Sequence, residues 1–214
     1  MSTLYYFAGA CSLVPHIVAR ELELEITAKA APRPDDVGRP EYLDTVNSLG
    51  KVPALQLNDG VVITQNVAIV EYLAALGEAQ GKAGVVYPKL GTIEHAQARR
   101  WLSFANSDIQ PTFAPLFRPQ RFSSDEASYP MIKATATELL LDLYAHVDGE
   151  YADKDWIANN QYSAADIYIY VTYRWAKGMG IDLTPYRNLQ KMVAAIQTRP
   201  AVIKGLAEQG VALI

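Results

Sequence analysis

Every strand-like segment of this 214-residue chain lies within its first 64 residues, and the remainder has the periodicity of helices. In the first part, short runs of β-branched and aromatic residues alternate with amphipathic runs. The strand-like runs are TLYYF (3–7), EITAKA (25–30), VPALQL (52–57) and VVIT (61–64), and the helix-like runs are SLVPHIVARELEL (12–24) and NVAIVEYLAAL (66–76). The predicted order is therefore β-α-β followed by β-β-α.

The turn between the last two strand-like runs indicates how they pair. Asn58, Asp59 and Gly60 separate them, and Asp-Gly between two β-like runs is a strong signal of a β-hairpin. The earlier β-α-β unit predicts a parallel pair, because a crossover helix returns the chain to the same direction. Asn66 is a candidate N-cap for the last helix. We expect a small mixed sheet with its helices over residues 1–78.

After a glycine-containing linker, predicted at 79–91, the strand signals largely disappear. Four helical patterns follow, and they predict an all-α domain over 92–214. These patterns cover residues 92–117, 131–151, 163–180 and 189–200. The predicted fold class is thus an α/β domain followed by an α-helical bundle.

One helix start in the second domain carries a capping signal. Ser163 is followed three residues later by Asp166, which forms a capping box with Asp in place of the usual Glu or Gln. The helix that follows is apolar on most sides, so we expect it to be buried. We interpret Ser163 and Asp166 as a folding signal.

Charge and cysteine content exclude several classes of function. The net charge is −4, and a chain without a basic excess is a poor partner for nucleic acid. The single cysteine can form no internal disulfide and fits a reducing compartment. No apolar stretch has the length of a membrane span, and no signal peptide is recognisable. His16, His95 and His146 have no metal-ligand spacing, so we expect no metal and a cytoplasmic location.

The single cysteine, Cys11, lies in FAGACSLVPH between the first strand and the first helix. Two interpretations are open from the residues alone. A free cysteine is commonly a small buried hydrophobe that serves packing. A cysteine at a helix N-terminus is also in a position that favours an anion, which lowers the pKa of a thiol and activates it.

Several segments, in order along nearly the whole chain, resemble the cytosolic glutathione transferases, and the cysteine favours their bacterial beta class. The segments are YFAGACSLVPHIVARE, NSLGKVPALQLNDG, ITQNVAIVEYLA, WLSFANSDIQPTFAPLF and YSAADIYIYVTYRWA. The resemblance implies a thioredoxin-like N-terminal domain, glutathione as a substrate and a homodimer. The net charge and the lack of a long apolar stretch, given above, predict no nucleic-acid partner and no membrane partner.

For Cys11 the resemblance implies contact with the thiol of bound glutathione. The reaction that this contact supports would be either conjugation of glutathione to an electrophile or thiol–disulfide exchange. We expect its pKa to be lower than that of a free thiol. Tyr6 and Ser12 are the neighbours that could take the role of Cys11, because other transferase classes use a Tyr or Ser hydroxyl to hold the glutathione thiolate. Tyr6 is equally well explained as an ordinary strand aromatic.

The resemblance also implies the residues that bind glutathione. A cis Val52-Pro53 bond, with Lys51 before it, would expose the Val52 backbone to the cysteinyl part of glutathione. Gln65 and Asn66 stand where the helix start would bind the γ-glutamyl group. Gln65 departs from the family, which usually has an acidic residue there.

Asp108 matches an acidic residue that reaches the glutathione of the partner subunit in the family. Its carboxylate could supply the charge that Gln65 lacks. A solvated helix carboxylate is the alternative interpretation.

The sharpest departure is Gln110-Pro111, where the beta class usually has a His-Lys pair. Gln110 forms hydrogen bonds but cannot titrate, and Pro111 removes a charge and an N–H. We expect the electrophile pocket to include Gln110 and the aromatics Phe113, Tyr168 and Trp175. Aromatic residues in helices also commonly serve the core.

The departures at Gln65 and Gln110 leave a rival function open. The chain would then be a non-catalytic member of the fold that binds ligands or partner proteins. Cys11, the Lys51-Val52-Pro53 segment and the polar pair at the helix start argue against this rival.

Overall fold

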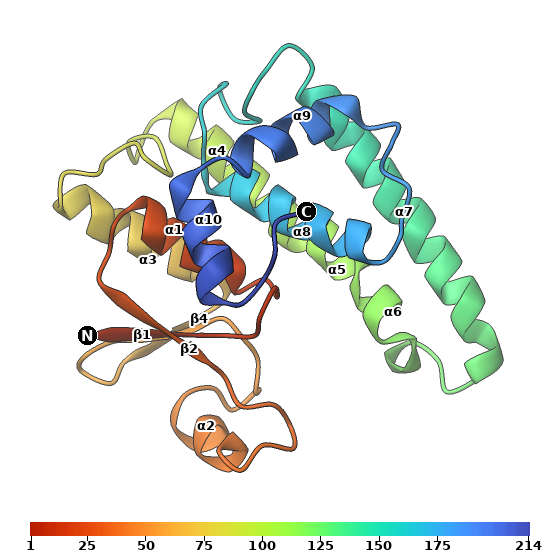
Figure 1. Ribbon diagram of the computed structural model, residues 1–214, viewed down its shortest axis with the longest axis horizontal. Coiled ribbons are helices and arrows are strands. Elements are labelled where there is room, and N and C mark those ends of the chain that lie inside the picture. Colours follow the sequence, from red (N-terminus) through yellow and green to blue (C-terminus); the bar gives the residue numbers. More distant parts are fainter.

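The computed structural model describes all residues from Met1 to Ile214. Its single sheet has four strands in the order β2-β1-β3-β4 (Figure 1). The strands are β1 (Ser2–Tyr6), β2 (Ile26–Ala30), β3 (Ala54–Gln56) and β4 (Val62–Thr64). β1 and β2 are parallel, whereas β3 is antiparallel to both β1 and β4. The predicted mixed sheet and its hairpin are therefore confirmed.

Helices cover both faces of this sheet. α1 (Leu13–Glu21) and α3 (Asn66–Ala79) pack together on one face. α2 (Arg39–Thr45) lies on the other face, where Tyr42 packs against Tyr5. The helical pattern of α2 escaped the sequence prediction because this short helix buries only Tyr42.

The C-terminal half is all helical. Its longer helices are α4 (Ile93–Phe104), α7 (Tyr129–Glu150), α8 (Ala164–Gly178), α9 (Arg187–Ile196) and α10 (Pro200–Glu208). Short turns complete it: η1 (Ala105–Ile109), α5 (Gln110–Thr112), α6 (Ala114–Phe117), η2 (Pro119–Arg121) and η3 (Glu126–Ser128). The expected linker at 79–91 lies between α3 and α4, except that its first residue, Ala79, is the last residue of α3. No helix is both long and apolar enough to span a membrane.

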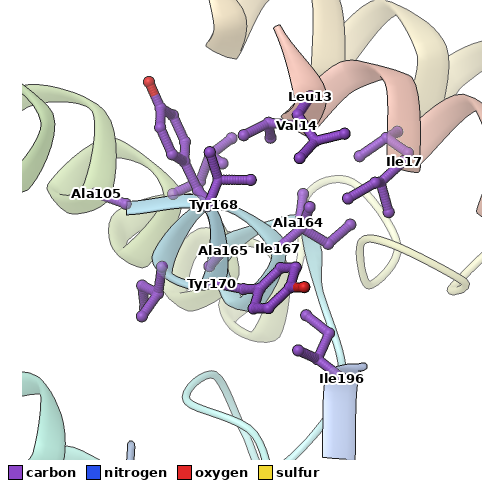
Figure 2. Packing of buried hydrophobic residues seen from close by; sticks show 14 of the residues in the cluster. Leu13, Val14, Ile17, Ala105, Ala164, Ala165, Ile167, Tyr168, Tyr170 and Ile196 are labelled. Atoms are coloured by element: carbon purple, nitrogen blue, oxygen red, sulfur yellow. The ribbon is translucent and has the colours of Figure 1, made fainter. Parts of the chain in front are cut away.

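One hydrophobic core of 44 buried residues joins the two halves. Figure 2 shows Leu13, Val14 and Ile17 of α1 near Ala164 and Ile167 of α8. Since the segment that carries the cysteine leads directly into α1, this shared core fixes that segment relative to the α domain.

The helix expected over 92–117 is interrupted, which corrects the sequence prediction. Its middle, η1, is a π-helical turn in which the Gln110 N–H donates to the Ala105 carbonyl, five residues earlier. Pro111 explains the interruption. It has no N–H, and its ring would clash with the Ser107 carbonyl in a regular helix. π-turns of this kind are frequent at functional sites.

The predicted capping box at the start of α8 is confirmed. Asp166 is fully buried and accepts four hydrogen bonds. The Tyr151 hydroxyl donates at 2.8 Å, the Ile157 N–H at 3.0 Å, the Ser163 N–H at 2.9 Å and the Ser163 hydroxyl at 3.1 Å. The carboxylate thus ties the start of α8 to the segment that precedes it.

Replacing Asp166 with Asn is expected to destabilise the fold by about 2 kcal/mol at pH 7, since the amide nitrogen cannot accept from Ser163. Burial raises the pKa of Asp166 from 3.8 to about 6. A raised folded-state pKa gives a stabilising contribution that is present below pH 3.8 and lost as the pH rises through 6. The difference in the free energy of unfolding between the wild type and Asp166→Asn should therefore grow by about 2 kcal/mol when the pH is lowered from 7 to 4. Urea unfolding at both pH values measures it.

The exposed Asp44 provides the control, because it makes no side-chain hydrogen bond. Asp44→Asn should change the free energy of unfolding by less than about 0.5 kcal/mol. A wild-type advantage over Asp166→Asn that is equal at pH 4 and pH 7 would contradict the raised pKa.

Candidate active site

A cleft of about 430 Å³ lies between the N-terminal domain and the α domain. It brings together residues that are far apart in the sequence. Nine residues expected at the site line it: Cys11, Lys51, Val52, Pro53, Gln65, Asn66, Gln110, Phe113 and Trp175. Residues that the sequence analysis did not single out also line it: Asn47, Leu49, Thr64, Asn106, Phe117, Arg118 and Arg121. Nothing in their local sequence distinguishes the latter from surface positions.

Cys11 lies in the turn between β1 and α1, two residues before the helix begins. Its thiol lies 3.5 Å from the Val52 carbonyl oxygen, to which it donates a hydrogen bond. The turn is fastened from the α domain, because the Trp175 indole N–H donates to the Gly9 carbonyl at 2.7 Å. Cys11 is therefore held against the Val52 backbone rather than free to rotate into solvent.

Burial raises the pKa of the Cys11 thiol above its ordinary value of 9.0. Hydrogen bonds from the Asn66 and Gln110 side chains and from the backbone at the start of α1 favour the thiolate but only partly offset burial. This corrects the expectation of a lowered pKa. The helix start acts in the expected direction, but the enclosure of the sulfur between two domains outweighs it.

Tyr6 and Ser12 do not line the cleft, contrary to their expected role as substitutes for Cys11. The Ser12 hydroxyl is buried and bonds the backbone of Phe7, accepting from its N–H at 3.2 Å and donating to its carbonyl at 3.3 Å. The Tyr6 hydroxyl points to α10, 3.4 Å from the Glu208 carbonyl. Both side chains thus stabilise the turn and the domain contact.

The Val52-Pro53 peptide bond is cis, as the resemblance implied. The Val52 N–H has no partner within the chain, and its carbonyl accepts only the Cys11 thiol. The preceding Lys51 carbonyl is fixed by the Tyr42 hydroxyl at 2.7 Å and the Asn47 amide at 2.9 Å. The α2 side of the sheet thus holds an unpaired stretch of backbone at the cleft.

Gln65 and Asn66 line the cleft at the start of α3. Gln65 has a φ of 74°, a left-handed conformation that is rare outside glycine. Asn66 is buried, and its amide donates to the Tyr168 hydroxyl at 3.1 Å, while its Oδ1 atom has no partner. Backbone strain and an unpaired buried polar atom together are typical of a binding site.

Tyr168 lies behind the cleft rather than in its lining, which corrects its placement in the electrophile pocket. It is fully buried, and its hydroxyl contacts Asn66, Asn106 and Gln110. The π-turn places Asn106 and Gln110 on the same hydroxyl. Tyr168 therefore orients the two amides, of Asn66 and Gln110, that approach the Cys11 sulfur.

An aromatic wall closes the α-domain end of the cleft. Phe113, Phe117 and Trp175 form it. Phe113 and Trp175 meet edge to face with ring centroids 5.2 Å apart, and Phe117 is 5.8 Å from each of them. Phe117 is exposed and Trp175 is half-buried at the cleft, whereas Phe113 is buried and packs against both of them.

Asp108 is exposed and lies in a different groove, between η1 and α7. It accepts a hydrogen bond from the Ser107 hydroxyl at 2.8 Å and does not reach the cleft of its own chain. His16 is buried between Glu208 and Gln209, away from Cys11. No group of three or more His, Cys, Asp or Glu residues is placed to hold a metal ion.

Comparison with known families assigns both halves of the chain. Residues 8–76 match the family "Glutathione S-transferase, N-terminal domain", and residues 104–200 match "Glutathione S-transferase, C-terminal domain". The glutathione S-transferase GST-4.5 of Xanthomonas campestris pv. campestris is 35% identical over 206 residues, which are 93% of this chain and 96% of that protein.

Solved structures agree over the whole length. A bacterial beta-class glutathione S-transferase from Sphingomonas chungbukensis superposes with a TM-score of 0.83 at 32% identity, covering 98% of this chain and 100% of that one. A sphingomonad glutathione S-transferase complexed with glutathione gives the same TM-score at 34% identity and the same coverage. With both domains matched and the cleft built as described, the chain belongs to the glutathione S-transferase family.

Proposed function

We propose that this glutathione transferase binds glutathione along the Val52 backbone, with the glutathione sulfur directed to Cys11. The observation that carries the proposal is the unpaired Val52 N–H beside a carbonyl that already contacts the Cys11 thiol. A peptide-like ligand can pair with both backbone groups as a short antiparallel strand. The curated relative named a glutathione S-transferase favours catalysis over a non-catalytic binding role.

The two ends of glutathione are proposed to meet different parts of the cleft. The γ-glutamyl carboxylate suits the free N–H groups at the start of α3, where Gln65 and Asn66 stand. Lys51 supplies a cation for a carboxylate. No acidic residue lines the cleft to bind the γ-glutamyl ammonium group, so Gln65 is its uncharged acceptor.

Asp108 is proposed to serve the neighbouring subunit of a homodimer. Its exposed position in the groove beside α7 directs it away from its own cleft. The carboxylate would then meet the glutathione ammonium of the partner subunit. This arrangement supplies the charge that Gln65 does not. We place the enzyme in the reducing cytoplasm, where a free thiol persists.

Cys11 is proposed to act in two ways, one as the neutral thiol and one as the thiolate, and its raised pKa decides which form is present at a given pH. At neutral pH the protonated thiol donates a hydrogen bond to the glutathione thiolate, which stabilises that nucleophile. As a thiolate, Cys11 attacks a disulfide of glutathione, forms a mixed disulfide and releases one glutathione thiolate. Gln110 offers no titratable group to assist conjugation, so conjugation is expected to be slow, and thiol exchange should increase as the pH rises and Cys11 ionises.

Calorimetric titration with reduced glutathione tests the proposal. The wild type should give saturable binding, and Lys51→Gln should weaken it about fivefold by removing a cation from the cleft. Lys133→Gln is the matched control, since this exposed lysine lies on α7 outside the cleft. Absence of binding at millimolar glutathione would refute the proposed function.

A further inference from the structure

The α-domain end of the cleft combines an aromatic wall with two arginines. Phe113, Phe117 and Trp175 form the wall. Arg118 follows Phe117 immediately, and Arg121 is the last residue of η2. In Figure 1, α6 extends from the α bundle toward the level of the sheet. The residues that bind glutathione in our proposal come from the N-terminal domain, so this end is available to a second substrate.

Neither guanidinium has a partner in the chain. Arg118 and Arg121 are exposed, and no ion pair, side-chain hydrogen bond or aromatic stacking engages them. Apart from Arg187, every other arginine contacts a carboxylate, a carbonyl oxygen or an aromatic ring. Those arginines are Arg20, Arg33, Arg39, Arg99, Arg100, Arg174 and Arg199. Two of the three unengaged guanidinium groups therefore lie in one cleft.

The charge of the cleft also differs from that of the chain. The whole protein carries a net charge of −4. The cleft is lined by three cations, Lys51, Arg118 and Arg121, and by no Asp, Glu or His. Such a cleft attracts anions and holds no acid to neutralise its arginines. Glutathione occupies the Lys51 side in our proposal, which leaves the charge at the aromatic wall unmatched.

We propose that the second substrate of this transferase is an aromatic electrophile that carries a carboxylate. The ring would pack on Phe117 and Trp175, which the buried Phe113 supports from behind, and the carboxylate would meet the Arg118 and Arg121 guanidinium groups. This inference rests on the proposed function. It adds a substrate class that the aromatic wall alone would not select. An apolar wall offers a carboxylate no partner, so burying the charge there would cost desolvation free energy that the two arginines offset.

Two probes of nearly equal shape distinguish the contribution of the carboxylate to recognition from that of the aromatic ring. They are 4-chloro-3-nitrobenzoate and 4-chloro-3-nitrobenzamide. In either reaction the glutathione thiolate forms a bond to the ring carbon that bears chlorine. Chloride leaves with the electron pair of the broken bond, and the thiol proton passes to solvent. The uncatalysed rate with each probe corrects for the different reactivities of the two rings.

The wild type is expected to show a kcat/KM about tenfold higher for the benzoate than for the benzamide, after this correction. Arg118→Gln and Arg121→Gln should each lower that ratio about threefold, and 0.5 M salt should lower it as well, since exposed charges are screened. Arg187→Gln is the matched control, because Arg187 is exposed and unengaged but lies at the start of α9. It should keep the wild-type ratio.

Binding provides a readout that does not depend on turnover. The two conjugation products, which differ only in carboxylate against carboxamide, are titrated calorimetrically beside glutathione. Tighter binding of the carboxylate product, lost in Arg118→Gln and Arg121→Gln, supports the inference.

Equal preference for the two probes and products, with glutathione binding intact, would overturn the inference alone. An equal loss of affinity for glutathione itself in the arginine variants would assign both arginines to glutathione and would also overturn it. Failure to bind glutathione at all would refute the proposed function and the inference together.

Discussion

Cys11→Ala is expected to abolish the mixed disulfide with glutathione while leaving non-covalent glutathione binding within about threefold of wild type. Cys11 is the single thiol in the chain, so no other residue can form the adduct. The proposed binding groups, the Val52 backbone and the start of α3, remain in place. Intact-protein mass spectrometry after incubation with oxidised glutathione measures the adduct, and calorimetry measures the binding.

The variant should also fold. Cys11 is half-buried, and the hydrogen bond that its thiol donates is the 3.5 Å contact with the Val52 carbonyl. Its loss should cost about 1 kcal/mol or less. Cys11→Ser is the matched variant, since it retains a hydrogen-bond donor but cannot form a disulfide. An adduct in either variant, or none in the wild type, would contradict the assigned role.

The pH dependence of adduct formation follows from the direction of the Cys11 pKa. Because burial raises that pKa above 9.0, the thiolate should be the minor form at neutral pH, and its fraction should keep rising from pH 7 to pH 9. The rate of adduct formation should rise with it and reach no plateau below pH 9. A plateau near neutral pH would show that the helix start prevails over burial.

Gln110→His is expected to raise conjugation of a chloronitroarene about 100-fold, the lower end of what general acid–base groups contribute. Gln110 lines the cleft, and its side chain approaches the Cys11 sulfur. A histidine there would place a titratable ring beside the reacting sulfur atoms. The conjugation rate should then acquire a pH dependence near the ordinary histidine pKa of about 6.5, which the wild type lacks.

Two controls separate titration from a change in packing. Gln110→Asn retains an amide at this position and should not raise the rate. Asn106 lies one helical turn earlier, lines the cleft and contacts Tyr168, so Asn106→His introduces the same ring at a neighbouring position. If the wild type conjugates the chloronitroarene as fast as Gln110→His does, the view that Gln110 limits conjugation is contradicted.

The strands, the hairpin turn and the capping box were accessible to sequence reasoning because they depend on short-range signals. Strand runs, the Asp59-Gly60 turn and the Ser163–Asp166 spacing act over a few residues, and the structure confirms each of them. Longer patterns were less reliable. The single helix expected over 92–117 contains a π-turn, because Pro111 acts through a clash that periodicity does not register.

The candidate site shows the same division. Cys11, Val52 and Asn66 were identified from local motifs, and all three line the cleft. Tyr6 and Tyr168 were assigned by type and position, yet the Tyr6 hydroxyl points to α10 and Tyr168 lies behind the cleft. An aromatic residue looks the same in the sequence whichever side of its helix or strand meets the site.

The sequence by itself determined the fold class, the family and the position of the single thiol at the start of a helix. Only the tertiary structure decided the environment of that thiol. The sulfur is enclosed by residues from both domains, and this burial raises the Cys11 pKa that the helix start alone would lower. Likewise, only folding brings Arg118 and Arg121 into the cleft that contains Lys51 and no acid. Desolvation and charge density depend on which distant segments meet, and local sequence patterns do not contain that information.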